Sequence, residues 1–471
     1  MENSKLLQLL RTFSAREWKS FLDFARSPYF NRNREVTGLC EWLAAAAPGA
    51  DSINRRAVFS ALFPGQAYDD ARLNHLMSFA LKLGERFLAF EKLEEDGFTV
   101  DYYTLQSLAD RGLEKEYRFL FEKKHAALWR EKRRDARFYL ENYWLENLEA
   151  NRLSRSTVRK FNEHVQRTAD HLDAFYLAEK LRCTCYMLTS QYVIATPYNL
   201  QLVQEISRFV EELPALPEAP AIQAYFRIFQ LLTKEDSRSD FEALKTLLAG
   251  HQASFGAEEM AELYQYAINY CNLQIMKAKE HFVGEALELY IRGVESGILL
   301  QNGFLSPWHF KNMIKLGLRL KKYDWTEHFI LNNNRFLENE YRQDALYYNL
   351  AELYYHTHRY DEAMVHLNKM EFTDLHYNLG AKVILAKIYF ETEAYDALES
   401  LLHAFRTYLH RNKLISEDLR RAYLNFIVLL TQVIGATPEK RHLLRKKVEN
   451  TQLLAEKNWL LGMMGSKTAS A

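Results

Sequence analysis

The sequence predicts an all-α fold in which helical hairpins repeat through the second half, after an N-terminal helical region. Glycine and proline are scarce, since the 471 residues contain 17 and 9 of them, where average usage would give roughly 33 and 24. So few turn-forming residues cannot supply the many tight turns of a β-sandwich or barrel. Apolar residues also follow a helical period along most of the chain, and a pattern of tyrosine, leucine and alanine recurs in its second half.

The first long helix is predicted from a capping signal. The Ser14 side chain can accept a hydrogen bond from the backbone N–H of Glu17, and the Glu17 carboxylate can reach back to the backbone of Ser14. Phe13 can pack on Trp18 at the same end. The helix should end before Pro28, because the residue preceding a proline is disfavoured in the helical conformation.

Two more helices complete an N-terminal helical domain that we place at residues 1–105. One runs from about Arg55 to Phe63 and stops at Pro64-Gly65, and the next begins behind Asp69-Asp70. The second of these is apolar along one side for roughly six turns. The residues on that side are Leu73, Leu76, Met77, Ala80, Leu83 and Phe87.

Helical periodicity continues through residues 106–212, where we expect helical hairpins that could be continuous with the repeats beyond. Residues 213–220 hold three of the nine prolines and form the predicted boundary. A solenoid of repeats is expected at 221–464 and a disordered tail at 465–471.

Helix start signals recur after this boundary. Asp240 can cap a helix that begins at Phe241. Ser306 followed by Pro307 is the pair expected at an N-cap and the first helical position, and Thr437-Pro438 repeats it.

The repeat is clearest between Tyr347 and Met370. Its pattern positions are Tyr347, Leu350, Ala351, Tyr354, Tyr360, Ala363, Leu367 and Met370. The position of Ala363 recurs 35 residues later at Leu398 and 37 residues earlier at Thr326, where Gly317 replaces the usual aromatic residue of the first helix. This pattern resembles the tetratricopeptide (TPR) repeat, whose unit is about 34 residues long.

The resemblance covers residues 307–406 clearly and implies a solenoid of stacked hairpins. Small residues such as Ala351 let the two helices of a hairpin approach, and large ones such as Tyr354 fill the space between hairpins. The apolar segment Trp459–Met464 is expected to cap the solenoid, with contact to another chain as the alternative. An unrelated helical bundle with a chance Tyr-x-x-Ala motif is the competing interpretation of the repeat.

In the TPR family the first helix of each hairpin lines a concave groove that binds a partner. By repeat position, the resemblance implies that ten residues of this chain line it: Trp308, Lys311, Lys315, Arg319, Tyr348, Glu352, Tyr355, His356, Lys387 and Phe390. This mixture of aromatic anchors and cations suits a peptide that carries carboxylates. For Tyr355 and Phe390, packing within the solenoid is the alternative.

The sequence lacks the known motifs of catalysis. It has no phosphate loop, no Gly-x-Ser-x-Gly elbow, no His-Glu-x-x-His and no Cys-x-x-Cys. His356-x-His358 has no third ligand nearby, which favours surface histidines over a metal site. The four cysteines, Cys40, Cys183, Cys185 and Cys271, are too few for a disulfide scaffold and are interpreted as buried thiols. We therefore expect no catalytic site, no metal and no cofactor.

Charge and hydropathy limit the partners. Lys+Arg and Asp+Glu both number 61, so no net field draws the protein to nucleic acid. No apolar run approaches the roughly 20 residues that span a membrane. The first residues also lack the apolar run of a signal peptide. We expect a cytoplasmic protein without membrane contact.

These observations favour a non-enzymatic adaptor that binds a protein or peptide partner through the concave face. The alternative is a DNA-binding regulator, because the helices of Ile53–Phe90 are faintly similar to the helical part of winged-helix domains. Against it, the reading helix would begin with Asp69-Asp70, which phosphates repel, and no β-hairpin wing follows Leu88. A third hypothesis places an enzyme site among the aromatic-rich helices of residues 170–300.

Overall fold

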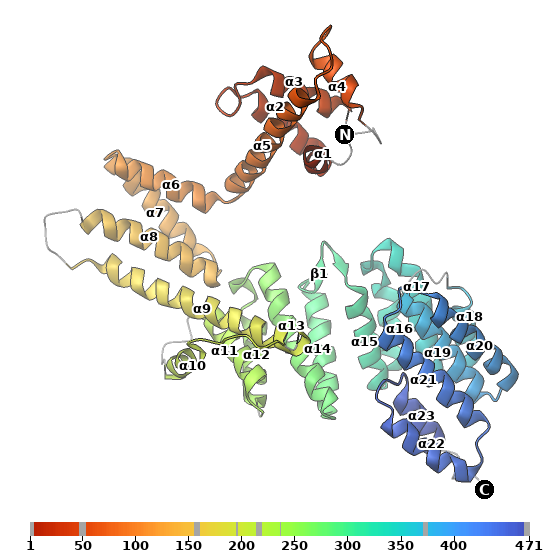
Figure 1. Cartoon of the computed structure of the whole chain (residues 1–471). Coiled ribbons are helices and arrows are strands. Elements are labelled where there is room, and N and C mark those ends of the chain that lie inside the picture. Colours follow the sequence, from red (N-terminus) through yellow and green to blue (C-terminus); the bar gives the residue numbers. More distant parts are fainter. Residues whose placement is uncertain are drawn as a thin grey trace. The chain divides into compact units, whose positions relative to one another are not determined.

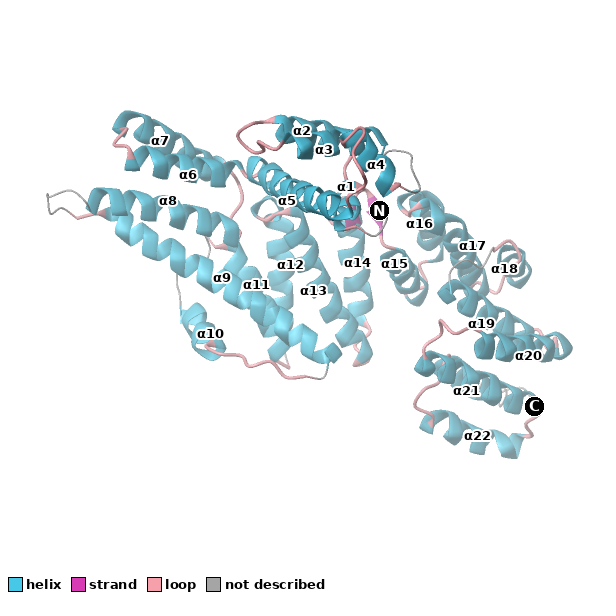
Figure 2. Cartoon of the chain, turned by 45° about the horizontal axis from the view of Figure 1, so that its top comes forward, coloured by secondary structure: helices cyan, strands magenta, loops and turns pink. Residues whose placement is uncertain are grey.

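The computed structural model describes residues 4–46, 53–154, 161–194, 196–212, 219–235, 237–370 and 375–465. Helices α1 to α23 make up most of these residues, and the only sheet among them is one short strand pair (Figures 1 and 2). The prediction of an all-α fold is therefore confirmed. The chain divides into two compact units, Met1–Lys180 and Leu181–Ala471.

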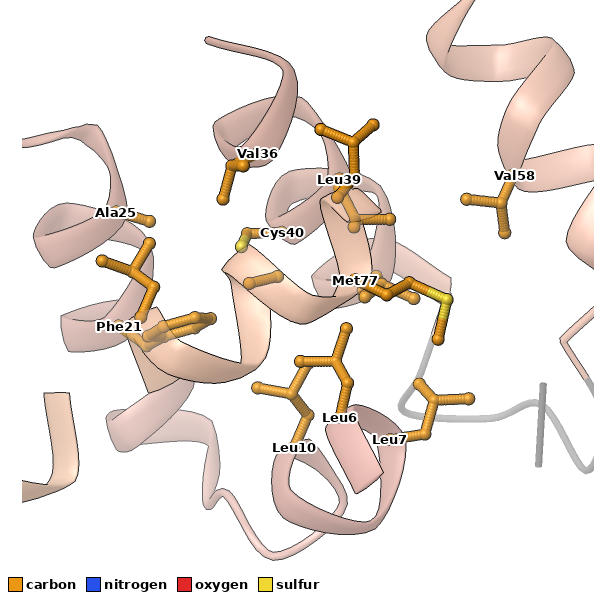
Figure 3. Close-up of a cluster of buried hydrophobic side chains, with 14 of the residues drawn as sticks. Leu6, Leu7, Leu10, Phe21, Ala25, Val36, Leu39, Cys40, Val58 and Met77 are labelled. Carbon is orange, nitrogen blue, oxygen red and sulfur yellow. The ribbon is translucent and has the colours of Figure 1, made fainter. Parts of the chain in front are cut away.

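The first unit begins with five helices around one apolar core. These are α1 (Lys5–Leu10), α2 (Ala15–Arg26), α3 (Arg34–Ala46), α4 (Arg55–Leu62) and α5 (Asp70–Glu95). Helix α5 contacts α1, α2 and α3, and the apolar side predicted for it is buried against them. Figure 3 shows how the five helices contribute to this core, with Leu6, Phe21, Leu39, Val58 and Met77 among the buried side chains.

The capping box predicted at the start of α2 is present. The backbone N–H of Glu17 donates to Ser14 Oγ over 3.2 Å, and the backbone N–H of Ser14 donates to Glu17 Oε2 over 2.7 Å. The ring of Phe13 lies edge-on to that of Trp18, with 5.8 Å between centroids. As predicted, α2 ends before Pro28.

Four further helices follow, and their interior is more polar. They are α6 (Gly97–Asp110), α7 (Glu114–Arg130), α8 (Ala136–Ser154) and α9 (Glu163–Ile194), and the division between the two units falls within α9. Helices α6, α7 and α8 pack on one another. Helix α8 buries not only apolar side chains but also four polar or charged ones, which are Glu141, Asn142, Glu146 and Glu149.

In its described residues, the second unit contains α10 (Val203–Glu212) and then six helical hairpins. The hairpins are α11 (Pro220–Thr233) with α12 (Arg238–Gly250), α13 (Ala257–Met276) with α14 (His281–Glu295), α15 (Pro307–Arg319) with α16 (Tyr323–Asn333), α17 (Asn339–His356) with α18 (Tyr360–Leu367), α19 (Leu375–Glu391) with α20 (Tyr395–Arg411), and α21 (Glu417–Ile434) with α22 (Pro438–Asn450). Each hairpin packs its two helices together, and the first helices α15, α17 and α19 contact one another in series (Figure 1). Helix α23 (Lys457–Gly465) packs on α21 and α22.

Two glycines permit close helix contacts within this series. A Cβ atom on Gly380 of α19 would lie 2.6 Å from the hydroxyl oxygen of Tyr348 on α17. A Cβ atom on Gly317 of α15 would lie 2.5 Å from Thr326 Oγ1 and 2.9 Å from the ring of Trp325, both on α16. The side chains of α16 lie so close to Gly317 that an aromatic residue would not fit at this position.

The predicted helix starts are partly confirmed. Helix α15 begins at Pro307, and the backbone N–H of Trp308 donates to Ser306 Oγ over 3.3 Å. The prediction for Asp240 is wrong, because α12 begins two residues earlier at Arg238. The Asp240 carboxylate instead forms an ion pair with Arg227, 2.6 Å away.

A short β-hairpin between α14 and α15 was not predicted. Strand β1 (Leu300–Gln301) pairs antiparallel with β2 (Phe304–Leu305). The two turn residues, Asn302 and Gly303, both have positive φ, 51° and 83°. Asn-Gly is the preferred sequence for such a turn, so this dipeptide could have been used to predict the hairpin.

The remaining predictions concern segment boundaries. Most of the proline-rich segment 213–220 lies outside the described residues, as does the predicted tail after Gly465, the last residue of α23. Leu460 and Met464 of α23 are buried in one apolar cluster with residues of α19 to α22. The apolar C-terminal segment therefore packs on the last hairpins of this unit.

Candidate functional site

The ten predicted partner-contacting residues lie on α15, α17 and α19. We call the surface that these three helices form the first-helix face. The Lys311 ammonium of α15 lies 5.0 Å from the ring centroid of Tyr348 on α17, and that of Lys387 on α19 lies 5.4 Å from the ring of Tyr355 on α17. These two contacts link α17 to α15 on one side and to α19 on the other.

The α15 end of this face is exposed. Trp308 has 58% of its surface exposed, and Lys315 and Arg319 are exposed as well. The guanidinium of Arg319 donates to both carboxylate oxygens of Glu280, over 3.1 and 2.5 Å. Residues three to four positions apart share one side of a helix, so an aromatic ring and two cations lie along α15. We call Trp308, Lys315 and Arg319 the open part of the face.

The middle of the face is occupied by packed aromatic rings. Tyr348 is only 4% exposed and lies 5.1 Å from the ring of Tyr377, and burial raises the pKa of its hydroxyl far above the usual value. Lys311 lies within cation–π range of both rings. Glu352 is half-buried on α17, and His356 is exposed near its end. Tyr348 therefore has a packing role here.

The α19 end of the face is covered by the chain itself. Tyr355 and Phe390 are each 8% exposed, so both rings are buried within the solenoid, as the packing alternative anticipates. Lys387 forms an ion pair with Glu456, and its side chain keeps only 13% of its exposure. The ring of Phe390 meets that of Trp459 edge-on, 5.5 Å between centroids. We call Tyr355, Lys387 and Phe390 the covered part of the face.

A carboxylate that sequence reasoning missed organises the covered part. Glu391, the last residue of α19, accepts hydrogen bonds from the hydroxyls of Tyr355 and Tyr360, each over 2.5 Å, and from the indole N–H of Trp459 over 2.8 Å. Burial, followed by the hydrogen bond to Glu391, raises the pKa of Tyr355. No sequence motif marks this group, because Trp459 is 68 residues away.

A second unpredicted cluster lies within the first unit, where Glu146 of α8 is completely buried. His125 Nε2 of α7 lies 3.1 Å from one of its carboxylate oxygens, and His164 Nδ1 of α9 lies 2.6 Å from the other. Burial alone raises the pKa of Glu146, but the hydrogen bonds from these histidines outweigh that effect and hold it below the usual value. The cluster joins three helices, and each carboxylate oxygen already has a partner.

The neighbouring Glu149 is arranged in a similar way. Tyr117 donates its hydroxyl to Glu149 over 2.9 Å, and Arg152 binds both of its oxygens, over 2.6 and 2.8 Å. Burial opposes ionisation, but these two partners hold the pKa of Glu149 below the usual value. Among the residues that the structure describes, no three His, Cys, Asp or Glu side chains are placed to hold a metal ion.

A cleft of the second unit lies elsewhere, between the second helices α12 and α14. Its volume is about 510 Å³. Its charged side chains pair with one another, since Lys245 lies 2.9 Å from Glu242 and 2.5 Å from Glu285, while Arg292 pairs with Glu288. Each cation that lines this cleft is paired with a carboxylate, and the lining has three carboxylates for two cations.

The cysteines are mostly buried, with one exception. Burial raises the pKa values of Cys40 and Cys271 to about 12, and Cys185 is buried as well. The prediction was wrong for Cys183, which is exposed. Residues two positions apart face different sides of a helix, so Cys183 and Cys185 cannot both be buried by one neighbour.

The helix pair considered for DNA binding is α4 and α5. Asp69 caps α5, and Asp70 accepts hydrogen bonds from Arg55 and from the hydroxyl of Tyr68. Helix α5 continues to Glu95 where a wing would begin, and no strand occurs among the described residues of the first unit.

No protein-family model, no curated protein and no solved structure matches the chain. None of the described helices has the length and apolar character needed to cross a bilayer.

Proposed function

We propose that this chain is a non-enzymatic adaptor, and that a segment of a partner protein docks on the open part of its first-helix face. The observation that carries the proposal is the exposure of Trp308, 58%, on the same side of α15 as Lys315 and Arg319. Tryptophan and arginine are the side chains that most often dominate binding energy at protein interfaces. The resemblance to TPR repeats supports the same face, because that family binds partners with its first helices.

The chemistry of the open part favours an acidic partner segment. Two cations lie on one side of α15, and the carboxylate that Arg319 binds, Glu280, is itself largely exposed. A carboxylate of the partner can replace Glu280 on Arg319 at little cost, because exposed ion pairs contribute only about 0–1 kcal/mol. The Trp308 ring would then supply the apolar contact.

The test is capture of partners from the protein's own cells with a tagged full-length chain and two variants. One variant carries Trp308→Ala, Lys315→Glu and Arg319→Glu. The control carries Leu331→Ala and Val365→Ala, two exposed apolar residues of the second helices α16 and α18. Both variants should first show the helicity and melting temperature of the parent.

We expect at least one protein to bind the parent and the control, and to be lost from the open-part variant. A partner that binds all three equally would place the docking site elsewhere and contradict the proposal. Turnover of a substrate by the purified chain, without any captured protein, would contradict the adaptor function itself.

A further inference from the structure

Glu456 and Trp459 contact the covered part of the first-helix face, and the residues just before them bind to α21. The backbone N–H of Ala455 donates to the carbonyl of Ala422 on α21 over 3.2 Å, and the side-chain amide of Asn425 donates to the carbonyl of Leu453 over 2.8 Å. These bonds position Glu456 at Lys387 and Trp459 at Glu391. The chain therefore supplies its own occupant for this end of the face.

The site beneath Glu456 is built for a carboxylate. The Lys387 ammonium lies 5.4 Å from the ring centroid of Tyr355 and 5.7 Å from that of Trp459, with only 13% of its side chain exposed. Without Glu456, this mostly buried cation would lack its anionic partner. An unpaired buried charge is strongly disfavoured, so the site selects another carboxylate rather than an apolar group.

The site beneath Trp459 is built for an aromatic ring with a hydrogen-bond donor. The indole stands edge-on to Phe390 and lies 6.2 Å from the ring of Phe426. Its N–H is one of three donors to Glu391, and the other two are hydroxyls of α17 and α18 residues. When the indole leaves, two hydrogen bonds still satisfy this carboxylate, so an exchange does not leave Glu391 without partners.

The helix that contains most of the occupant has little stability of its own. Helix α23 has nine residues, and isolated helices shorter than about 12–15 residues are marginal in water. Its order therefore depends on packing, and Leu460 and Met464 provide the buried apolar contacts. Glu456 is 37% exposed in its side chain, so a competing carboxylate can approach Lys387 before Glu456 departs.

We propose that residues 456–459 act as a built-in occupant of the first-helix face, and that a partner segment with the same two groups replaces it. Such a segment carries a carboxylate and, three residues later, an aromatic ring with a hydrogen-bond donor. This inference rests on the proposed function, because it assigns the covered part to the same partner-binding face. It predicts that the full face becomes available only when Glu456 and Trp459 are displaced.

The test uses the full-length chain and a fluorescent peptide of residues 453–460. The opened variant carries Glu456→Ala and Trp459→Ala, and a further variant adds Lys387→Ala to it. The control peptide carries a lysine at the position of Glu456 and an alanine at that of Trp459. Fluorescence anisotropy then gives the dissociation constant of each pair, after circular dichroism has confirmed parental helicity.

We expect the peptide to bind the opened variant at least about tenfold more tightly than the parent, a difference of about 1.4 kcal/mol. Adding Lys387→Ala, or using the control peptide, should remove this binding. Equal binding to parent and opened variant, or none to a folded opened variant, would overturn the inference. Should the opened variant lose helicity, the isosteric Glu456→Gln variant takes its place, and because Trp459 still covers part of the site, we expect a smaller gain in peptide affinity over the parent.

A second measurement needs no variant. Hydrogen exchange of residues 456–464 in the parent should become faster in the presence of excess peptide, while exchange of α15 stays unchanged. Unchanged exchange of 456–464 at saturating peptide would overturn the inference. The capture experiment above changes only residues of α15, so its failure and the failure of peptide exchange are separate results.

Discussion

The open and covered parts of the first-helix face contain the same kinds of side chain in different surroundings. Each has an aromatic ring and a cation on the first helix of a hairpin: Trp308 with Lys315 on α15, and Phe390 with Lys387 on α19. In the open part these groups meet solvent, whereas in the covered part they meet Glu456 and Trp459. Position in a repeat therefore predicts which side of the helix a residue occupies, and it does not predict whether that side is exposed to solvent.

The two parts should differ most in the stability that is lost when one tryptophan is removed from each. Trp459→Ala removes ring contacts with Phe390 and Phe426 and a hydrogen bond to Glu391. We expect it to lower the unfolding free energy of the second unit by about 3 kcal/mol. Trp308→Ala should change it by less than about 0.5 kcal/mol. Chemical denaturation of the two variants measures both, and equal losses would contradict the division of the face.

A pair of glycine substitutions tests how tightly the middle of the face is packed. In Gly380→Ala the new methyl group would meet the Tyr348 hydroxyl at 2.6 Å, which should lower stability by about 1–3 kcal/mol. The control is Gly284→Ala in α14, where a Cβ meets nothing within 4 Å. Because alanine has a greater helix propensity than glycine, this substitution should raise stability by roughly 0.5–1 kcal/mol. Shifts of the same sign in the two melting temperatures would argue against close α17–α19 contact.

Lysine substitutions in the two parts should give a smaller difference in stability. Lys387→Ala removes the ion pair with Glu456 and two cation–π contacts and should lower the unfolding free energy by about 1 kcal/mol. Lys315→Ala in the open part should have no measurable effect on stability. The comparison is made by urea denaturation at low salt and at 1 M salt, where exposed ion pairs are screened. A stability loss for Lys315→Ala as large as that for Lys387→Ala would show that Lys315 is not exposed.

The smallest expected effect concerns pH and His309 on α15. Burial lowers the pKa of His309, and its Nε2 lies 3.1 Å from Gln265 Oε1. The unfolded chain takes up a proton near pH 6.5 that the folded chain resists, so this group reduces stability as the pH falls through that value. His309→Gln should reduce this loss of stability between pH 7.5 and 5.5. Parallel stability profiles for parent and variant would contradict buried packing of His309 beside the open part.

Local features of the fold were predictable from the sequence. The capping box at Ser14, the helix start at Pro307 and the apolar side of α5 all depend on residues within a few turns of one another. The prediction for Asp240 was wrong because its carboxylate forms an ion pair with Arg227 and does not cap the helix. Short-range spacing therefore identifies the helices, although one residue type can serve as a cap or as an ion-pair partner.

The covering of the face could not be predicted, for a physical reason. The indole of Trp459 and the carboxylate of Glu391 meet across 68 residues, and neither belongs to a motif. The Glu146 cluster likewise joins side chains of α7, α8 and α9. Such contacts arise from how helices pack, and a single sequence carries no periodic signal for them.

The central claim is that a partner docks on the open part of the first-helix face, and site-specific photo-crosslinking tests it most directly. A photoreactive amino acid is placed at Lys315 in one full-length chain and at Val365, which is 51% exposed on α18, in another. After irradiation in the protein's own cells, we predict a crosslink to a second protein from position 315 and none from position 365. Crosslinks from position 365 alone would contradict the claim.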